Sequence, residues 1–375
     1  MTKHSYFRSV FLSFKDYKMK KILLVTMTAA TFGLTACANN IDTTAESDKT
    51  IVTTQLKTTT VTEDNYDIAE TQGIFEGYVK KIAKATDTNG VGVFWHVKTG
   101  ADPKDKTIPR INFDTIYSWS LIDLTEDVTL TMPETNGRYQ SAWFIDEEHY
   151  NPMALNEAGE YTITQKDVGT RYVMIVIRTQ ANTTDPADLA EAGKLQEKLK
   201  LSQKDRGSYV SSYKWNHDEV IKMRAHFEQI IKDKGMKSDV MFGKRGSMTD
   251  EQHNAGTAGG WGGFEKTQAV YPLFYPTTTE HQTLTLKDVP AGAFWSLTVY
   301  DKGGFAQTDT YNINSQFAVK NEDGSVTINF GGDKNAQNYM ETFEGWNVTL
   351  RLYRPTAAYF NGEWKKPELK IVPKS

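Results

Sequence analysis

The sequence predicts a mainly β protein of the α+β class, in which two domains of the β-sandwich or jelly-roll type are joined by a helical connector. The 375 residues are enough for two domains of about 150 residues each. Short stretches of β-branched and aromatic residues, bounded by turn signals, form two blocks. Between the blocks, apolar residues recur at helical spacing. These three observations together predict two β-rich units with helices between them.

Composition and charge narrow the class of protein. The chain is 39% hydrophobic and 12% aromatic, which is typical of a globular protein and excludes a mostly disordered one. It contains no stretch of about 20 apolar residues, so a multi-span membrane protein is excluded. The formal net charge of −4 gives no indication of a nucleic-acid surface. The single cysteine excludes an internal disulfide and a multi-Cys metal site.

Residues 1–36 have the features of a bacterial lipoprotein signal peptide. Two lysines follow Met19, the predicted start of translation, and precede a moderately apolar run that is too short and too weak for a spanning helix. The run ends in Leu34-Thr35-Ala36-Cys37, which has the aliphatic residue, two small residues and cysteine of a lipobox. Cys37 is therefore the predicted lipidation site. The alternative is an ordinary cleaved signal followed by a free cysteine.

Residues 37–66 are predicted to form a flexible tether, because Thr, Asn, Asp and Ser predominate there. Three acyl chains on a lipidated N-terminus would give lasting membrane anchoring. Ala38, rather than an aspartate, follows the cysteine. In a bacterium with two membranes this favours the outer membrane, with the folded part facing the periplasm.

The N-terminal domain is expected at residues 67–182. Apolar side chains at helical spacing predict an amphipathic helix over residues 70–85. The segment 172–177 is apolar on both faces, which indicates a central strand. With it, β-branched and aromatic segments predict strands at 128–132, 139–145, 161–164 and 172–178.

The helical connector is expected at residues 183–240, where Asp185-Pro186 opens one amphipathic segment and Gly235 ends a second. The C-terminal β domain is expected at 241–375. It begins with a glycine-rich stretch, 243–263, which predicts a functional or mobile loop. Its strands are predicted at 283–286, 294–300, 326–330 and 348–353.

Several motifs, taken in order, resemble two known families. Asn112-Phe113-Asp114-Thr115-Ile116-Tyr117-Ser118 resembles the N-x-D-T-x-Y-S signature of the family called domain of unknown function 1254. Phe294-Trp295-Ser296-Leu297-Thr298-Val299-Tyr300 and Gly345-Trp346-Asn347 resemble domain of unknown function 1214. The resemblance implies two β-sandwich-like domains joined by helices. It implies no activity, because both families are named for having none assigned and a fold alone cannot supply one.

The familiar catalytic signatures are absent: the sequence contains no G-x-S-x-G elbow, no phosphate-binding loop and no H-E-x-x-H. The most informative polar set is Asn112, Asp114, Tyr117 and Arg138. Asp114 has apolar neighbours, so its carboxylate is expected to have either a hydrogen-bonded cationic partner, for which Arg138 is the candidate, or a raised pKa. One interpretation is a structural pair that docks the N-terminal segment on the sheet. The other is a site in which Arg138 holds a ligand carboxylate or sugar hydroxyl and Asp114 acts as a base.

His149 and Trp261 complete the candidate pocket. Trp261 lies in the glycine-rich stretch, where a large aromatic residue is explained by a lid or a binding contact. His149 is either a catalytic partner of Asp114 or an ordinary surface or strand-end histidine. A metal site would have to combine distant residues such as His96, His149 and Asp114, because no two histidines lie at i, i+2 or i, i+4. We therefore predict neither a metal nor a cofactor.

Two functions follow, and whether the protein is an enzyme stays open. The first is an envelope-anchored lipoprotein that binds a small ligand, a glycan or a partner without catalysis. The alternative is a hydrolase with a pocket near Asp114, Arg138 and His149, roofed by the segment of Trp261. The expected partners are the membrane that holds the lipid anchor and a small ligand or envelope component, but not nucleic acid.

Overall fold

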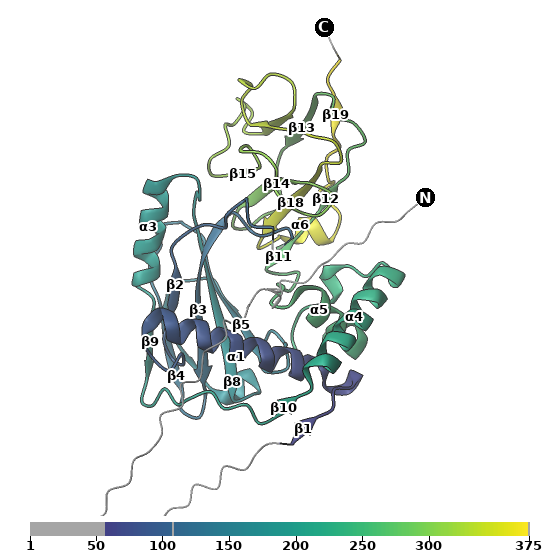
Figure 1. Cartoon of the computed structure of the whole chain (residues 1–375). Helices are drawn as coiled ribbons and strands as arrows, with labels where there is room; N and C mark the ends of the chain where they lie inside the picture. Colours follow the sequence, from purple (N-terminus) through teal and green to yellow (C-terminus); the bar gives the residue numbers. More distant parts are fainter. Residues whose placement is uncertain (1–56, 107–108, 374–375) are drawn as a thin grey trace, which may run out of the picture.

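The computed structural model describes residues 57–106 and 109–373, which form two β-sandwiches with helices packed beside them (Figure 1). The predicted fold class is therefore confirmed. The predictions about the signal peptide, Cys37 and most of the tether fall outside the described residues. Within the described part of the chain, no helix is long and apolar enough to cross a membrane.

The N-terminal sandwich consists of two antiparallel sheets. The larger sheet has the order β2 (Trp95–Val97), β3 (Thr115–Asp123), β8 (Tyr172–Gln180), β5 (Gln140–Asp146) and β6 (Ala154–Leu155). The smaller has the order β7 (Gly159–Ile163), β4 (Val128–Met132) and β9 (Lys200–Gln203). Because side chains alternate along a strand, β8 sends Val173, Ile175 and Ile177 into the core between the sheets. The predicted strands of this domain are present, whereas β3 was not predicted.

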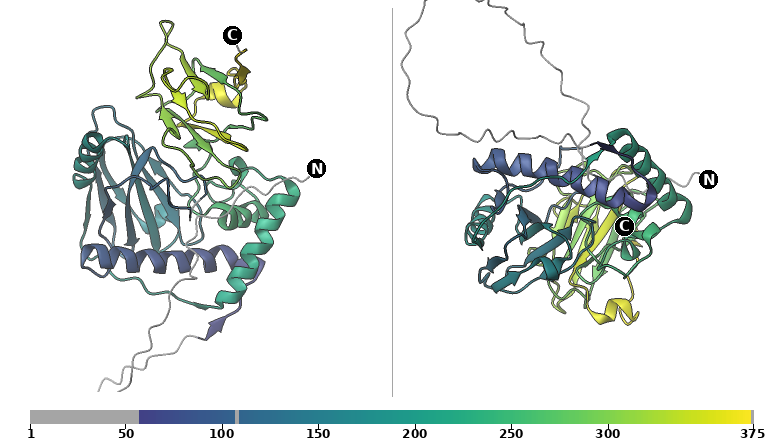
Figure 2. Two further views of the ribbon diagram at one scale, coloured as in Figure 1. Left: turned by 45° about the horizontal axis from the view of Figure 1, so that its top comes forward. Right: turned by 90° about the horizontal axis from the view of Figure 1, so that it is seen from below.

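A long helix, α1 (Tyr66–Thr86), runs along the other face of the larger sheet (Figures 1 and 2). Its Phe75 packs with Leu121 of β3 and Met174 of β8 in a second apolar core. The predicted helix at 70–85 is thus confirmed and starts four residues earlier. The helix ends where Asp87 adopts a left-handed conformation, a common way for a helix to stop.

The expected connector at 183–240 is divided between two places. Its first helix, α3 (Pro186–Glu197), packs on β2, β3 and β8, because Leu189 and Ala192 bury an apolar stripe against Ile116. Strand β9 then joins the smaller N-terminal sheet. The second helix, α4 (His217–Lys234), packs instead on α5 (Asp250–Gly260) and on α1 (Figure 1).

The glycine-rich stretch is not the loop that the sequence predicted. Most of it forms α5 (Asp250–Gly260), whose first turn is closed by a capping box between Thr249 and Gln252. A Cβ atom on Gly256 would lie 2.3 Å from the carbonyl oxygen of Met241. The glycines therefore permit close packing of a helix rather than movement of a loop.

The C-terminal sandwich also has two sheets. One has the order β11 (Ala269–Val270), β18 (Asn347–Tyr353), β14 (Trp295–Tyr300) and β15 (Asn312–Asn314), with β12 (Leu273–Phe274) also on β18. The other has the order β17 (Tyr339–Met340), β16 (Val326–Phe330), β13 (Gln282–Leu286) and β19 (Lys370–Ile371). Leucine and valine side chains from both sheets, together with Trp295 and Trp346, fill the core between them. The strands predicted for this domain are all present.

The remaining elements are short. Strands β1 (Thr58–Thr59) and β10 (Lys214–Trp215) pair in parallel at the start of α4. Single-turn helices are α2 (Gln165–Val168), α6 (Ala357–Phe360), η1 (Glu63–Asn65) and η2 (Ser238–Val240).

Residues 109–114, which we call the junction strip, join the two sandwiches. The strip leads into β3 of the first sandwich and lies on the polar face of β14 and β18 in the second. The hydroxyl of Tyr300 donates to the carbonyl oxygen of Ile111 (2.8 Å), and Phe113 packs between Tyr300 and Tyr311. This polar face of β14 and β18 is therefore buried, although the opposite face already forms the sandwich core.

Candidate functional site

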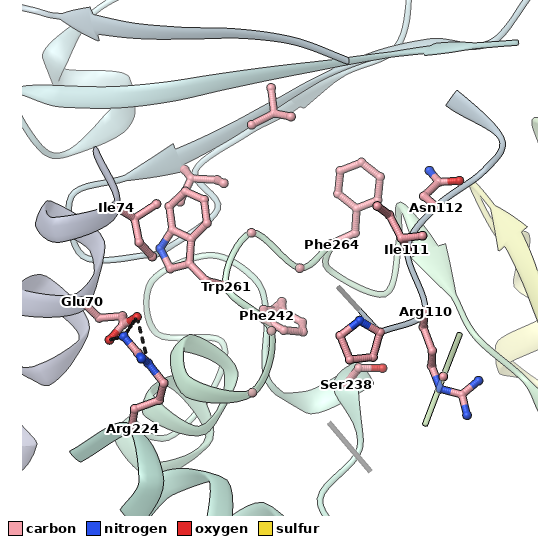
Figure 3. A pocket seen from close by; sticks show the side chains of 18 of the residues that line it. Glu70, Ile74, Arg110, Ile111, Asn112, Arg224, Ser238, Phe242, Trp261 and Phe264 are labelled. Atoms are coloured by element: carbon pink, nitrogen blue, oxygen red, sulfur yellow. Dashed lines mark hydrogen bonds and ion pairs between the residues drawn. The ribbon is translucent and has the colours of Figure 1, made fainter. Parts of the chain in front are cut away.

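A large cleft lies between the two sandwiches and the helices. Its volume is about 3750 Å³, and its walls come from α1, α4, the larger N-terminal sheet, the segment after α5, the junction strip and the C-terminal sheet. Figure 3 shows Glu70 and Ile74 of α1 on one side and Arg110, Ile111 and Asn112 on the other. Ligand sites commonly occupy such concave places between domains.

Four aromatic side chains, which we call the aromatic row, line this cleft side by side. Tyr117 and Trp119 alternate on β3, so both face the cleft rather than the sandwich core. Their rings lie 5.7 Å apart, Tyr78 of α1 stacks on Trp119 at 4.4 Å, and Trp261 lies 6.4 Å from Tyr78. Three of the four are only partly buried. The row presents a flat apolar surface to whatever enters the cleft.

Arg178 lies at the end of the aromatic row. It is paired across β8 and β3 with Tyr117, and its guanidinium lies 5.6 Å from the Tyr117 ring. Its other face stacks on Phe264, with 3.4 Å between the guanidinium carbon and the ring centroid. Burial opposes the charge of Arg178, but the surrounding tyrosines outweigh burial and raise its pKa. The side chain therefore carries a full positive charge at the wall of the cleft.

An ion pair closes the end of the cleft near α4. The guanidinium of Arg224 holds both carboxylate oxygens of Glu70, at 2.7 and 2.8 Å (Figure 3). Burial raises the pKa of Glu70, and Arg224 partly offsets this effect. The pair joins α1 to α4, which fixes the width of the cleft at this end.

Asn112 and Asp114 lie in the junction strip, beside the cleft. Asp114 is fully buried, and its carboxylate accepts hydrogen bonds from Ser296, Asn312 (2.9 Å) and Tyr353 (3.2 Å) of the C-terminal sandwich. Asn112 donates to the hydroxyl of Tyr117 at 3.1 Å. Asp114 therefore ties the two sandwiches together, while Asn112 positions a member of the aromatic row.

The expected pairing of Asp114 with Arg138 is wrong. Arg138 forms a bidentate pair with Asp188 of α3, at 2.6 and 2.9 Å, and also donates to the carbonyl oxygen of Gln180. The Arg138 guanidinium lowers the pKa of Asp188. The reason is topological: Arg138 precedes β5, where the chain passes α3, whereas Asp114 faces the other sandwich.

His149 is buried between α5 and the turn before β6, apart from Asp114 and Arg138. Its Nε2 accepts from the backbone N–H of Gly262 (2.9 Å), so the ring proton lies on Nδ1 and is donated to Thr257 (2.8 Å). Burial lowers the pKa of His149 well below its usual value, and His253 adds to the effect. Both ring nitrogens are therefore occupied, one by α5 and the other by the segment that follows it.

Trp261 is not on a mobile lid. Its side chain is 5% exposed, and its indole N–H donates to Thr71 of α1 at 3.1 Å. Its ring also stacks on His149 at 5.6 Å. One edge still lines the cleft (Figure 3).

The suggested metal ligands do not come together. His96 hydrogen-bonds with Ser118 at 2.8 Å on the face of β2 that is turned away from the cleft, while Asp114 and His149 hold the separate partners described above. Among residues 57–106 and 109–373, no group of three His, Cys, Asp or Glu residues is placed to hold a metal ion. Of the six candidate pocket residues, Asn112, Tyr117 and Trp261 line the cleft and the other three do not.

The cleft residues that the sequence analysis missed are Arg178, Trp119 and Tyr78. A signal for Arg178 was available, because a charged residue at the end of the apolar run 172–177 is rarely buried without a purpose. Alternation along β3 could have indicated Trp119. The contribution of Tyr78 depends on how α1 crosses the sheet, which no local pattern encodes.

Comparisons with known proteins agree with this organisation. Two family models match, Protein of unknown function (DUF1254) over residues 91–203 and Protein of unknown function (DUF1214) over residues 276–357. The families suggested by the sequence motifs, and their order, are thereby confirmed. A search of curated proteins gives no significant match.

Two crystal structures are similar to the chain. The VPA0106 protein from Vibrio parahaemolyticus has a TM-score of 0.59 at 17% identity, and the match covers 82% of this chain and 100% of that chain. An uncharacterized protein from Burkholderia cenocepacia has a TM-score of 0.46 at 12% identity, with 83% of this chain and 88% of that chain covered. The first similarity shows a shared fold and says nothing of activity.

Proposed function

For a chain that carries a DUF1254 region followed by a DUF1214 region, we propose that the cleft between the two sandwiches binds a small ligand without catalysing a reaction. The observation that carries the proposal is the aromatic row. Folded proteins bury most of their large aromatic surface, and a partly exposed row on the wall of a deep cleft is typical of a ligand site.

Two further features support binding rather than hydrolysis. Asp114, Arg138 and His149 lie in three separate places, and each has structural partners. The wall of the cleft is also well fixed, because Glu70–Arg224 and the junction strip hold its ends. A preformed site loses less conformational entropy when a ligand binds.

Native mass spectrometry of the purified protein, beside the same sample denatured, tests the proposal. We expect an excess mass that disappears on denaturation. Gly77 of α1 lines the cleft, and a Cβ atom there would have no neighbour within 4 Å, so Gly77→Trp should place a bulky indole in the cleft at α1, obstruct the ligand and remove the excess mass. Gly77→Ala is the matched control and should retain it. A Gly77→Trp protein that keeps the ligand, or a wild-type protein with no excess mass, would contradict the proposal.

We also propose that the protein is a lipoprotein, anchored through Cys37 in the outer membrane of a two-membrane bacterium and facing the periplasm. The support is the Leu34-Thr35-Ala36-Cys37 motif and Ala38 after it. Metabolic labelling with a tritiated fatty acid is expected to mark the protein and to fail for Cys37→Ser. Labelling that persists in Cys37→Ser would place the lipid elsewhere.

A further inference from the structure

We propose that Arg178 is the anchor of an anion subsite in the cleft, and that the ligand is an organic carboxylate with a flat apolar body. This inference rests on the proposed binding function and names its ligand class. It begins from the position of Arg178 in the larger N-terminal sheet. Arg178 lies on the central strand β8, between Tyr117 on β3 and Ser141 on β5, on the face that lines the cleft.

No acidic side chain in the described part of the chain pairs with Arg178. The titratable groups around it are tyrosines, of which Tyr271 accepts a hydrogen bond from its guanidinium, and its Nε is buried without a hydrogen-bond partner. A largely buried guanidinium normally has a carboxylate or another strong acceptor, because leaving the charge without one is costly. The other buried arginine of this region, Arg351, has such acceptors in Thr298, Tyr300 and the carbonyl oxygen of Arg110.

The surroundings of Arg178 fit a single oxyanion. Phe264 covers one face of the guanidinium, so its edge remains for an acceptor. The hydroxyl of Tyr117 accepts from Asn112 and keeps its own proton for donation. Tyr271 lies close by: burial raises its pKa, and Arg178 partly offsets this. One guanidinium with phenolic donors suits a carboxylate, to which arginine binds through two parallel hydrogen bonds.

The rest of the cleft indicates the body of the ligand. The aromatic row leads directly away from Arg178, beginning with Tyr117 and Trp119. A flat apolar group attached to the carboxylate would lie against these rings in offset or edge contacts. The charge of the residues that line the cleft also favours an anionic ligand. Ten Lys and Arg residues and six Asp and Glu residues line the cleft, although the net charge of the chain is −4.

The test uses two probes of nearly equal shape, 2-naphthoate and the neutral 2-naphthamide. Dissociation constants are measured by calorimetry on the full chain carrying Cys37→Ser, in buffer without detergent. We expect the protein with an unaltered cleft to bind naphthoate at least tenfold more tightly than naphthamide, because a charge-assisted hydrogen bond contributes a difference in affinity of that size or more. Arg178→Met should bring the ratio of the two dissociation constants, naphthamide over naphthoate, close to one. The dissociation constant of naphthamide should stay within about twofold of the wild-type value, which also shows that the cleft is intact.

The matched control is Lys214→Met, which removes an exposed cation of the cleft and should leave the ratio unchanged within about twofold. Should Arg178→Met fail to fold, Arg178→Lys keeps the charge but not the two parallel donors, and it should lower the ratio severalfold. An Arg178→Met protein that still prefers naphthoate would overturn the assignment of Arg178.

The two proposals fail in different ways. Equal affinity for the two probes, with both lost in Gly77→Trp, would overturn the anion subsite and leave the binding cleft standing. Binding of both probes that survives Gly77→Trp, or the absence of any binding, would overturn the cleft and the subsite together.

Discussion

His149 shows how a residue that looks catalytic in the sequence can be structural. Its ring accepts from the Gly262 N–H and donates to Thr257, and it stacks on Trp261. Its backbone has φ of 65°, in the left-handed region, where asparagine is one of the better tolerated residues. Since the neutral ring makes both hydrogen bonds, protonation is incompatible with this arrangement.

The stability of the fold should therefore depend on pH through His149. In the folded state its pKa lies well below 6.5, the value of a free histidine. Below about pH 6.5, His149 therefore binds a proton in the unfolded chain but not in the folded chain. The stability contributed by His149 is complete above about pH 6.5 and is lost progressively as the pH falls below it.

We expect His149→Asn to be less stable than the wild type by about 1–3 kcal/mol at pH 8, because buried donors and acceptors lose partners. The difference should shrink at pH 5, since only the wild type loses the His149 contribution. Urea denaturation of both proteins at the two pH values measures this. The two proteins have all other titrating groups in common. A difference in their stabilities that stays constant or grows at pH 5 would therefore show that His149 is not buried in its neutral form.

At the scale of the element, α5 and α1 use glycine for opposite reasons. Gly256 of α5 lies against the backbone of Met241 and the ring of Phe242, leaving no room for a side chain. Gly77 of α1 faces open space. In a helix, alanine is otherwise favoured over glycine by roughly 1 kcal/mol.

The same substitution should therefore have opposite effects in the two helices. Gly256→Ala is expected to lower the free energy of unfolding by about 1–3 kcal/mol, the usual cost of overpacking. Gly77→Ala should raise it by about 0.5–1 kcal/mol. The denaturant midpoints of the two variants and of the wild type measure both effects. A Gly256→Ala protein as stable as the wild type would mean that α5 does not pack closely against residues 241–242.

At the scale of the whole molecule, the junction strip makes the two sandwiches one cooperative unit. Arg351 is buried and holds the carbonyl oxygen of Arg110 (3.0 Å) as well as Thr298 and Tyr300. Three residues further on, Arg354 also reaches the N-terminal sandwich, but it meets Glu157 in solvent, with both side chains exposed. The two arginines thus offer a buried and an exposed link between the same sandwiches.

We expect the wild type to unfold in a single calorimetric transition, and Arg351→Met to unfold at a clearly lower midpoint or in two transitions, because a buried link between the strip and the C-terminal sandwich is lost while those of Asp114 and Tyr300 remain. Arg354→Met is the matched control. It should shift the midpoint only slightly, since exposed ion pairs contribute about 0–1 kcal/mol. A single transition of unchanged midpoint in Arg351→Met would show that the strip does not couple the sandwiches.

The sequence by itself determined the elements whose pattern is local. Alternating or continuous apolar runs indicated β4, β8, β14, β16 and β18, helical spacing indicated α1 and α4, and ordered motifs indicated the two families. Strand β3 escaped prediction because Tyr117 and Trp119 face a cleft and not a core. Helix α5 escaped because its glycines resemble those of a loop until their neighbours are known.

Only the tertiary structure decided which side chains meet. Asp114 finds its partners at Ser296 and Asn312, 182 and 198 residues away, and Arg178 meets Phe264 from a different part of the chain. Periodicity reports which face of an element a residue occupies. It does not report which distant element covers that face, because that depends on how all the apolar faces are buried at once. The cleft therefore had to be found from the folded chain.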